Sequence, residues 1–252
     1  MPQRIIITGG AGNIGSAVTK LFDLKGAHTI VIDKNKDACD ALAAQIKYGT
    51  SIPADITKAD YMSEVIRCLD ELQHASSVPG FDHLVSVAGG LILGETGSLE
   101  QISEEAIRES IDFNLTSHLL LAKRLHPYMR PGIKRHGLPS ITFISSINAI
   151  RAYDNIAYSV AKAGLLGAVN ILAKKLGPEG IRINAVLPGT VPPSFDAAAS
   201  QAFDSLREET VLGYFATPRN IADMVYQITQ NSGITGQTFV VDAGQSINSN
   251  YP

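Results

Sequence analysis

Residues 4–15 read RIIITGGAGNIG, and this stretch decides the fold. It begins with an apolar run at 4–8, as a strand buried on both faces of a sheet requires. A glycine-rich turn follows, and residues 16–22 (SAVTKLF) continue with apolar side chains at helical spacing. A strand, a glycine turn and a helix in this order let the backbone approach a pyrophosphate, which then binds at the helix amino terminus. The stretch therefore predicts a dinucleotide-binding turn.

The next apolar run indicates which dinucleotide is preferred. Residues 28–32 end in Asp33, 18 residues after Gly15. A carboxylate at this place accepts hydrogen bonds from the adenosine ribose hydroxyls and repels a 2′-phosphate. The glycine turn contains no basic residue to offset that repulsion, and Lys34 is the one opposing charge. The sequence favours NAD over NADP.

The alternation of strand and helix continues along all 252 residues. Strand-like apolar runs occur at 4–8, 28–33, 50–54, 82–88, 140–145, 181–187 and 237–241. Segments of helical pattern lie between them, among them 36–47, 57–72, 103–130 and 155–176. Such alternation implies a parallel sheet covered on both faces. We therefore expect an α/β fold, a Rossmann-type doubly wound parallel sheet of about seven strands, in a single domain spanning 1–252.

Two irregular stretches interrupt this alternation. Residues 131–139 are basic, with Lys134, Arg135 and His136 in sequence, and we expect a solvated surface loop. Residues 188–217 begin with Pro-Gly just past a strand end, where ligands bind in open α/β sheets. A loop of this length in a compact domain often covers an active site, so 188–217 is the predicted substrate loop.

Tyr158 and Lys162 stand four residues apart within 157–164 (AYSVAKAG), which contains good helix formers and no proline. Residues four apart on a helix lie on one face, with Cβ atoms about 5–6 Å apart. A lysine cation about 4 Å from a phenol is worth roughly 4 kcal/mol at an effective dielectric of 20. That is enough to bring a tyrosine pKa from near 10 to about 7. The pair indicates an acid–base group, although a half-buried ring beside a solvated amine produces the same spacing.

Ser145 and Ser146 end the fifth strand, 12–13 residues ahead of Tyr158. A serine hydroxyl there can hydrogen-bond a substrate carbonyl beside the phenol. With these motifs in this order, nearly the whole chain resembles the short-chain dehydrogenase/reductase family. The matching segments are 8–15 for its cofactor loop, 55–56 for its adenine contact, 86–89 for its Asn-Asn-Ala-Gly strand end, 112–115 for its active-site asparagine, 182–189 for its sixth strand and 234–237 for the start of its last.

The resemblance implies that a hydride moves between a nicotinamide and a carbinol or carbonyl carbon. Tyr158 takes or gives the hydroxyl proton, while Lys162 lowers its pKa and holds the nicotinamide ribose. Ser146 orients the substrate oxygen, and Asn114 supports a water that leads from the lysine to solvent. The implied cofactor contacts are Gly9, Gly12, Asn13, Ile14, Gly15, Asp33, Asp55, Ile56, Ala88, Gly89, Tyr158, Lys162, Pro188, Gly189 and Val191. The expected activity is NAD-dependent interconversion of a small secondary alcohol and its ketone.

Several positions depart from the family pattern. Asn13 replaces the middle glycine of the cofactor loop, where asparagine tolerates a left-handed backbone better than most residues. The glycine spacing 9, 12, 15 resembles instead the extended branch of the superfamily, so a sugar-nucleotide epimerase or dehydratase is one alternative. A non-catalytic dinucleotide-sensing module is another. The common spacing of 13 residues before Tyr158 selects Ser145, whereas the Ile-Ser-Ser order selects Ser146, which we prefer.

Other classes of function find little support in the composition. The six histidines show no paired spacing for a metal site, and a net charge of −3 offers no footprint for nucleic acid. Two cysteines and the absence of a membrane-spanning pattern or signal peptide predict a cytoplasmic protein. Small residues at 157, 161, 164 and 168 allow close helix packing, either against the chain's own sheet or across a subunit interface. We expect a homodimer or homotetramer.

Overall fold

A computed structural model describes residues 2–58, 61–74, 80–129, 138–151, 153, 155–193 and 200–248. The side chains of 72–74 and 202 are outside the description. Most of the predicted basic loop, 131–137 with Lys134, Arg135 and His136, lies outside the described residues. So does the part of the predicted substrate loop at 194–199.

The sheet contains seven parallel strands in the order β3-β2-β1-β4-β5-β6-β7, which confirms the predicted fold class. Their bounds are β1 (Arg4–Thr8), β2 (His28–Asp33), β3 (Gly49–Pro53), β4 (His83–Ser86), β5 (Ser140–Ile144), β6 (Arg182–Pro188) and β7 (Gln237–Val241). The strand order reverses between β1 and β4, and ligands bind at such a switch point beyond the carboxyl ends of the strands.

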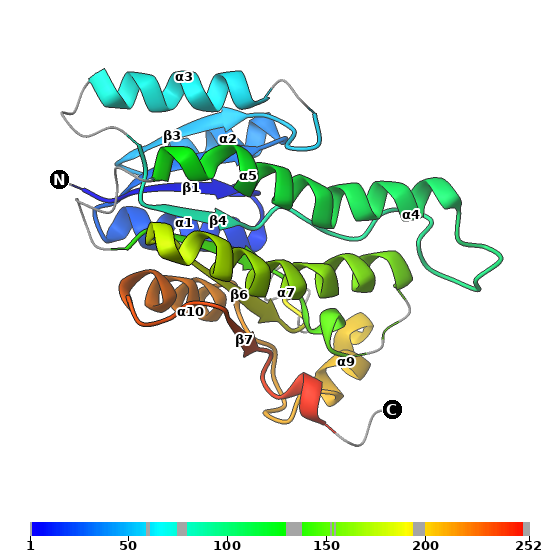
Figure 1. Cartoon of the computed structure of the whole chain (residues 1–252). Helices are drawn as coiled ribbons and strands as arrows, with labels where there is room; N and C mark the ends of the chain where they lie inside the picture. Colours follow the sequence, from blue (N-terminus) through cyan, green and yellow to red (C-terminus); the bar gives the residue numbers. More distant parts are fainter. Residues whose placement is uncertain are drawn as a thin grey trace.

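Helices cover both faces of the sheet (Figure 1). Neighbouring strand residues point to opposite layers. Ile6 packs into the layer beneath α3 (Tyr61–His74), α5 (Ser117–Met129) and α7 (Ile156–Leu176). Ile5 and Ile7 pack into the layer of α1 (Asn13–Leu24) and α10 (Pro218–Gln230). This alternation is the side-chain period of a strand buried on both faces. The remaining helical segments are α2 (Lys36–Ala43), α4 (Glu104–Ile111), η1 (Asp112–Thr116), η3 (Ile147–Ala149), η4 (Gly177–Glu179), η5 (Gln201–Phe203), α9 (Asp204–Glu208) and η6 (Gln245–Ile247).

The segment of helical pattern predicted over 103–130 is helical from Glu104 to Met129, and η1 is a π-helical turn within it, between α4 and α5. Asn114, in the middle of that turn, bonds both backbone groups of Gly90. The extra residue of a π turn re-aims a side chain, and such turns are frequent at functional sites. The interpretation of 188–217 as wholly irregular is wrong, since this segment contains η5 and α9.

Candidate active site

The turn after β1 leaves no space for side chains. Gly9 has a φ of +61°, which an L-residue adopts only with strain. A Cβ atom on Gly15 would lie 2.0 Å from the carbonyl oxygen of Gly9. Thr19 closes the turn from α1, because its hydroxyl donates to the Gly10 carbonyl at 3.1 Å. The backbone of this turn is therefore open to a pyrophosphate without intervening Cβ atoms.

Asn13 does not use the left-handed backbone expected of it. It is the first residue of α1, and its φ is not positive. Its side chain instead donates from Nδ2 to the carbonyl oxygen of Pro192 at 3.0 Å. The asparagine thus connects the glycine turn to the segment after β6, a role that its neighbours in the sequence do not reveal.

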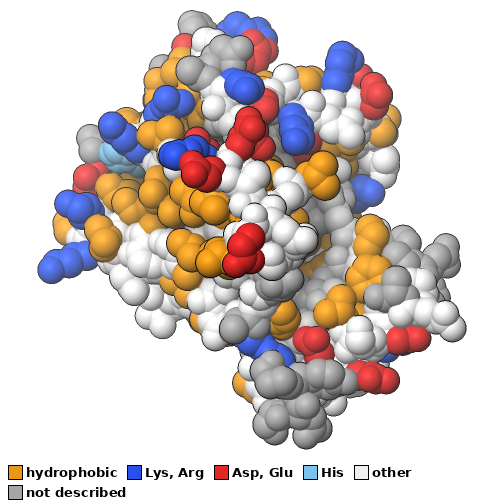
Figure 2. Space-filling view, turned by 90° about the vertical axis from the view of Figure 1, so that its right-hand side faces the viewer, with side chains coloured by type: hydrophobic (Ala, Val, Ile, Leu, Met, Phe, Trp, Pro, Cys, Tyr) orange, Lys and Arg blue, Asp and Glu red, His pale blue; other side chains and the backbone are white. Residues whose placement is uncertain are grey.

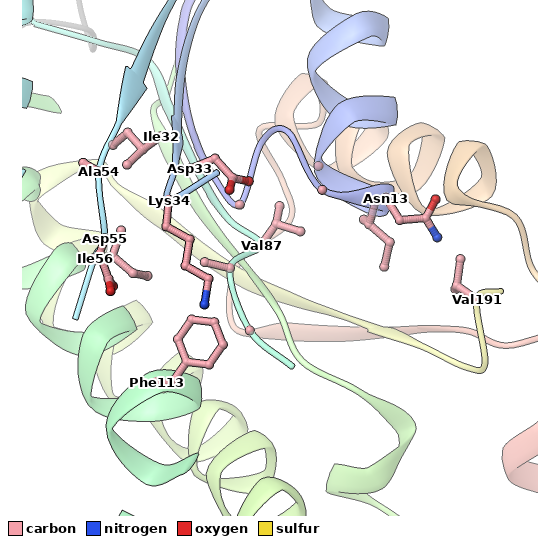
Figure 3. A pocket seen from close by; sticks show the side chains of 16 residues that line it. Asn13, Ile32, Asp33, Lys34, Ala54, Asp55, Ile56, Val87, Phe113 and Val191 are labelled. Atoms are coloured by element: carbon pink, nitrogen blue, oxygen red, sulfur yellow. The ribbon is translucent and has the colours of Figure 1, made fainter. Parts of the chain in front are cut away.

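A cavity of about 340 Å³ opens at the carboxyl edge of β1, β2 and β4 (Figure 3). The predicted cofactor residues that line it are Gly9, Gly12, Asn13, Ile14, Gly15, Asp33, Asp55, Ile56, Ala88, Gly89 and Val191. The lining residues that sequence analysis missed are Ile32, Lys34, Ala54, Val87 and Phe113. All five are sequence neighbours of predicted site residues, Phe113 of Asn114 and the other four of predicted cofactor contacts. Figure 2, which looks onto this edge, shows a hollow between the main body and the lobe at lower right.

Asp33 and Lys34 point in different directions from the end of β2 (Figure 3). The Asp33 carboxylate accepts from the backbone N–H of Ala11 at 3.2 Å and of Asn35 at 3.0 Å, which holds it against the glycine turn. The Lys34 ammonium lies 5.5 Å from the centroid of the Phe113 ring, where a cation–π contact is favourable. Of these two charged side chains, the Asp33 carboxylate is therefore the one that lies at the glycine turn.

Ser86 at the end of β4 bonds a histidine instead of supplying the asparagine of the family pattern. Its Oγ lies 2.6 Å from Nδ1 of His118 and 3.4 Å from the Thr8 hydroxyl. Burial lowers the pKa of His118 to about 3, so the imidazole is neutral. The contact fixes the strand immediately before Ala88 and Gly89, and the separation of 32 residues hid it from sequence analysis.

Asn114 and Lys162 both approach the backbone of Gly89. A Cβ atom on this glycine would lie 2.8 Å from Lys162 Nζ and 2.9 Å from Asn114 Oδ1. Asn114 Oδ1 accepts from Gly90 N at 2.9 Å, and its Nδ2 donates to Gly90 O at 2.9 Å. Since Gly89 lines the cavity, the lysine ammonium reaches its wall from α7 without being one of the lining residues.

Tyr158 and Lys162 share one face of α7, as the spacing predicted, but the lysine ammonium is bound to a backbone carbonyl. Lys162 Nζ lies 5.5 Å from the Tyr158 ring centroid and donates to the Ile144 carbonyl at 3.0 Å. Burial lowers the pKa of Lys162 to about 7. Burial also shifts the pKa of Tyr158, here upward, and a hydrogen bond with Ser146 opposes that rise. Desolvation thus shifts the pKa of the phenol in the direction opposite to the lowering that the lysine was expected to cause.

The two serines after β5 face different partners. Ser145 Oγ donates to the backbone carbonyl of Lys162 at 2.8 Å and fastens α7 to the strand. Ser146 Oγ donates to Asn148 Oδ1 at 3.0 Å and accepts from Asn148 N at 3.2 Å. Of the pair, only Ser146 interacts with the Tyr158 phenol.

Pro188 and Gly189 lie beside the last strand and not in the cavity. Gly189 N donates to the Val241 carbonyl at 3.1 Å, and a Cβ on Gly189 would lie 2.7 Å from Asp242 Cβ. Gln245, which is 1% exposed, accepts from Thr190 N at 2.8 Å. The segment after β6 is thus held by the carboxyl-terminal part of the chain, which sequence analysis did not connect to the site.

Two general findings concern metals and membranes. Among the residues that the structure describes, no group of three His, Cys, Asp or Glu side chains could hold a metal ion. One helical span, Ile156–Glu179, is long and apolar enough to cross a bilayer by composition. It includes α7, which packs against β6 and carries Lys162 at 2% exposure. The helix is therefore packed on the sheet along one side, while only 28% of its apolar window is buried.

Comparisons with known proteins agree on one family. A family model described as Enoyl-(Acyl carrier protein) reductase matches residues 9–246. An uncharacterized oxidoreductase of Schizosaccharomyces pombe is 31% identical over 249 residues, which cover 95% of this chain and 89% of the relative. An NAD-dependent glycerol dehydrogenase of Listeria innocua is 26% identical over 248 residues, which cover 96% and 93%. The crystal structure of a Burkholderia thailandensis oxidoreductase, described as a short-chain dehydrogenase/reductase, is 30% identical, with a TM-score of 0.82 over 97% of this chain and 93% of that one.

Proposed function

This chain belongs to the short-chain dehydrogenase/reductase family, whose members are oxidoreductases that use nicotinamide dinucleotides, and from that premise we propose its specific reaction. The protein transfers a hydride between NAD and a small secondary alcohol or ketone, with Tyr158 as the acid–base group. The observation that carries the proposal is the approach of Lys162 Nζ to Gly89, because it joins the helix of Tyr158 to the wall of the dinucleotide cavity.

The nicotinamide dinucleotide fits the residues present. Gly9, Gly12 and Gly15 line the cavity, where their backbone can meet a pyrophosphate, and Asp33 at the turn can accept from the adenosine ribose. Lys162 would hold the nicotinamide ribose near Gly89, and Asn114 fixes the adjoining backbone through its two bonds to Gly90. The bound cofactor supplies the hydride acceptor or donor.

The residues of this chain then manage the proton. Because burial raises the pKa of Tyr158, the side chain is a phenol at neutral pH and donates its proton to a carbonyl oxygen as an alkoxide develops. Ser146, already in contact with the phenol, donates a second hydrogen bond to that oxygen. In the reverse direction Tyr158 must first lose its proton, so alcohol oxidation should accelerate as pH rises.

NAD is proposed over NADP on electrostatic grounds. The Asp33 carboxylate lies at the turn, where it would repel a 2′-phosphate. Lys34, the cation that could offset this, contacts Phe113. The similarity to an NAD-dependent glycerol dehydrogenase supports the same choice.

Substitution of Tyr158 by phenylalanine tests the proposal. We expect turnover of small ketones with NADH to fall at least 100-fold, since general acid catalysis contributes about 10²–10⁴ in rate. NADH binding, followed by fluorescence, should stay within about twofold of the wild-type value. Undiminished turnover would sink the assignment of Tyr158. Binding of NADH by the wild-type protein without turnover of any ketone would favour a dinucleotide sensor.

Residues 157, 161 and 164 of the small-residue stripe face the protein's own interior. Ala157 and Ala161 are buried, and a Cβ on Gly164 would lie 2.8 Å from the Leu115 side chain of η1. The apolar residues exposed on α7 are Ile156, Val160 and Ile171. These exposed side chains support our proposal of a homodimer or homotetramer, which light scattering at micromolar concentration tests. The buried free thiols of Cys39 and Cys68 support a cytoplasmic location.

A further inference from the structure

The side chain of Gln245 is buried between the two described parts of the predicted substrate loop, 188–193 and 200–217. Gln245 is the first residue of η6, which lies beside α9 and is drawn in red in Figure 1. Its Oε1 accepts from Thr190 N at 2.8 Å, and its Nε2 donates to the Thr190 hydroxyl at 3.1 Å. The same Nε2 donates to Glu209 Oε2, just past α9, at 3.1 Å. One buried amide therefore bonds the start of the loop and its later part.

Both polar atoms of this amide have partners. A primary amide offers two N–H donors and one carbonyl oxygen. Gln245 uses the donors on Thr190 and Glu209 and the oxygen on the Thr190 N–H. A glutamate at this position would repel Glu209, and a leucine would leave the Thr190 N–H and the Glu209 carboxylate without this partner. The arrangement therefore requires an amide.

On the Thr190 side, the amide acts next to the dinucleotide cavity. Val191, the following residue, lines the cavity. The carbonyl of Pro192 accepts from Asn13 Nδ2 at 3.0 Å, and Asn13 lines the cavity as well. Gln245 thus fixes the residue before this part of the cavity wall, and Asn13 fixes the residue after it.

On the Glu209 side, the amide acts next to the segment that leads to the acid–base helix. Glu209 Oε2 accepts a second, longer hydrogen bond from the Tyr153 hydroxyl at 3.4 Å. Tyr153 lies between η3, whose N-cap is Ser146, and α7, which carries Tyr158. Asn248 Nδ2 donates to the Glu209 carbonyl at 3.0 Å and holds the backbone there. The end of α9 is therefore fixed to the chain on either side of it.

We infer that Gln245 is a positioning residue for the proposed reaction. Its amide holds Thr190 and Glu209 at a fixed separation, and so sets the substrate loop against the cavity wall on one side and the Tyr153 segment on the other. The inference rests on the proposed function, because it takes 188–217 as the loop that covers the substrate. The bond to Glu209 is the stronger of the two contacts, since its acceptor is charged.

Exchanging the two side chains tests the inference. Gln245→Glu places two carboxylates where the 3.1 Å bond was, so kcat/KM for small ketones with NADH should fall at least about tenfold, through KM. Adding Glu209→Gln restores a donor and an acceptor in the reverse order, and kcat/KM should return to within about threefold of the wild-type value. The Kd of NADH should stay within about twofold in both variants, because the side chain at 245 can still accept from Thr190 N.

The controls separate this contact from a general effect of added charge. Gln227→Glu makes the same change on the exposed face of α10 and should behave as wild type. Glu209→Gln alone keeps an oxygen that accepts from Gln245, so it should lose only about threefold. Lowering the pH from about 8 to about 5.5 should narrow the gap between Gln245→Glu and the exchanged variant, because two adjacent carboxyl groups then share one proton.

Each other outcome overturns the inference. If the exchanged variant stays as impaired as Gln245→Glu, the glutamine serves the fold and not this contact. A loss through kcat at unchanged KM would place its effect on the acid–base group. Full activity of Gln245→Glu would show that the contact with Glu209 has no part in the reaction.

Proteolysis without turnover separates this inference from the proposed function. Trypsin cuts after Arg207, which lies in α9 shortly before Glu209. With NADH present, Gln245→Glu should be cut there at least about tenfold faster than wild type, and the exchanged variant should not, since cleavage tracks how often the segment opens. If wild-type protein reduces no ketone while this difference persists, the proposed reaction fails and the positioning of the loop by Gln245 remains. If ketones are reduced and neither cleavage nor KM differs, the inference fails alone.

Discussion

The glycine turn and the acid–base centre lie at the same edge of the sheet, but they are built in opposite ways. The turn is a contiguous segment in which the absence of Cβ atoms lets the backbone close tightly on itself, as at Gly15. The acid–base centre assembles Asn114, Ser146, Tyr158 and Lys162 from η1, the end of β5 and α7. The glycine turn needs positions without side chains, and the acid–base centre needs polar side chains held in fixed positions.

The two regions also differ in how much they destabilise the folded protein. Removing side chains from a turn costs little beyond backbone entropy. Burying Lys162 and Glu95, by contrast, removes ionisable groups from water with few partners. The acid–base side therefore concentrates the unfavourable electrostatics of the molecule, as functional sites commonly do.

The largest effect on kcat is expected when Ser145 and Ser146 are each replaced by alanine and the two variants are compared. Ser146→Ala removes the hydroxyl that contacts Tyr158, and we expect kcat to fall about 10²–10³-fold, as when one preorganised donor is lost. Ser145→Ala removes only a bond to the Lys162 carbonyl, so kcat should change less than tenfold while the unfolding free energy falls by about 1 kcal/mol. Steady-state kinetics of both variants decide it, and a loss confined to Ser145→Ala would show that the wrong hydroxyl was chosen.

On the cofactor side, Gly15→Ala should weaken NADH binding at least tenfold and destabilise the fold by about 2–3 kcal/mol. The new Cβ would meet the Gly9 carbonyl at 2.0 Å, so the backbone of the turn must move. Gly167→Ala on α7 is the control, because nothing lies within 4 Å of its Cβ and alanine favours a helix. Fluorescence titration and urea unfolding measure the two effects, and equal behaviour of the variants would remove the steric argument.

A smaller effect is expected at the ribose contact. Asp33→Asn removes the charge that repels a 2′-phosphate, and the ratio of the NADPH to NADH dissociation constants should fall about tenfold, or about 1.4 kcal/mol. Asp37→Asn makes the same charge change on the exposed face of α2 and should leave the ratio unchanged. Equal ratios in wild-type protein and Asp33→Asn would contradict the preference for NAD.

The most gradual effect, spread over several pH units, is expected from Lys162. Its folded pKa is about 7 and its unfolded pKa is near 10.4, so the unfolded chain binds more protons between these values. The free energy of unfolding should therefore rise with pH across that window, by at most about 1.4 kcal/mol per unit, and flatten below pH 7. Lys162→Met should lack this rise. Urea unfolding of both proteins without cofactor at pH 7, 8 and 9 tests it, and parallel curves would show that the lysine is not desolvated.

The same division separates what the sequence could predict from what it could not. All seven strands were predicted to within three residues at each end, because buried parallel strands are apolar runs and their pattern is local. The π turn at Asn114 was not predicted, since the groups that hold it belong to Gly90, 24 residues away. The contacts of His118 with Ser86 and of Gln245 with Thr190 were not predicted for the same reason, because the partners are distant in the chain.

By itself the sequence determined the parallel sheet, the glycine turn and most of the residues that line the cavity, because these depend on local periodicity and on side-chain size. Only the tertiary structure decided that Lys162 donates to the Ile144 carbonyl, that Ser145 donates to the Lys162 carbonyl and that Glu95 is buried. Direction, desolvation and charge balance depend on every group packed around a side chain, and a linear pattern does not contain them.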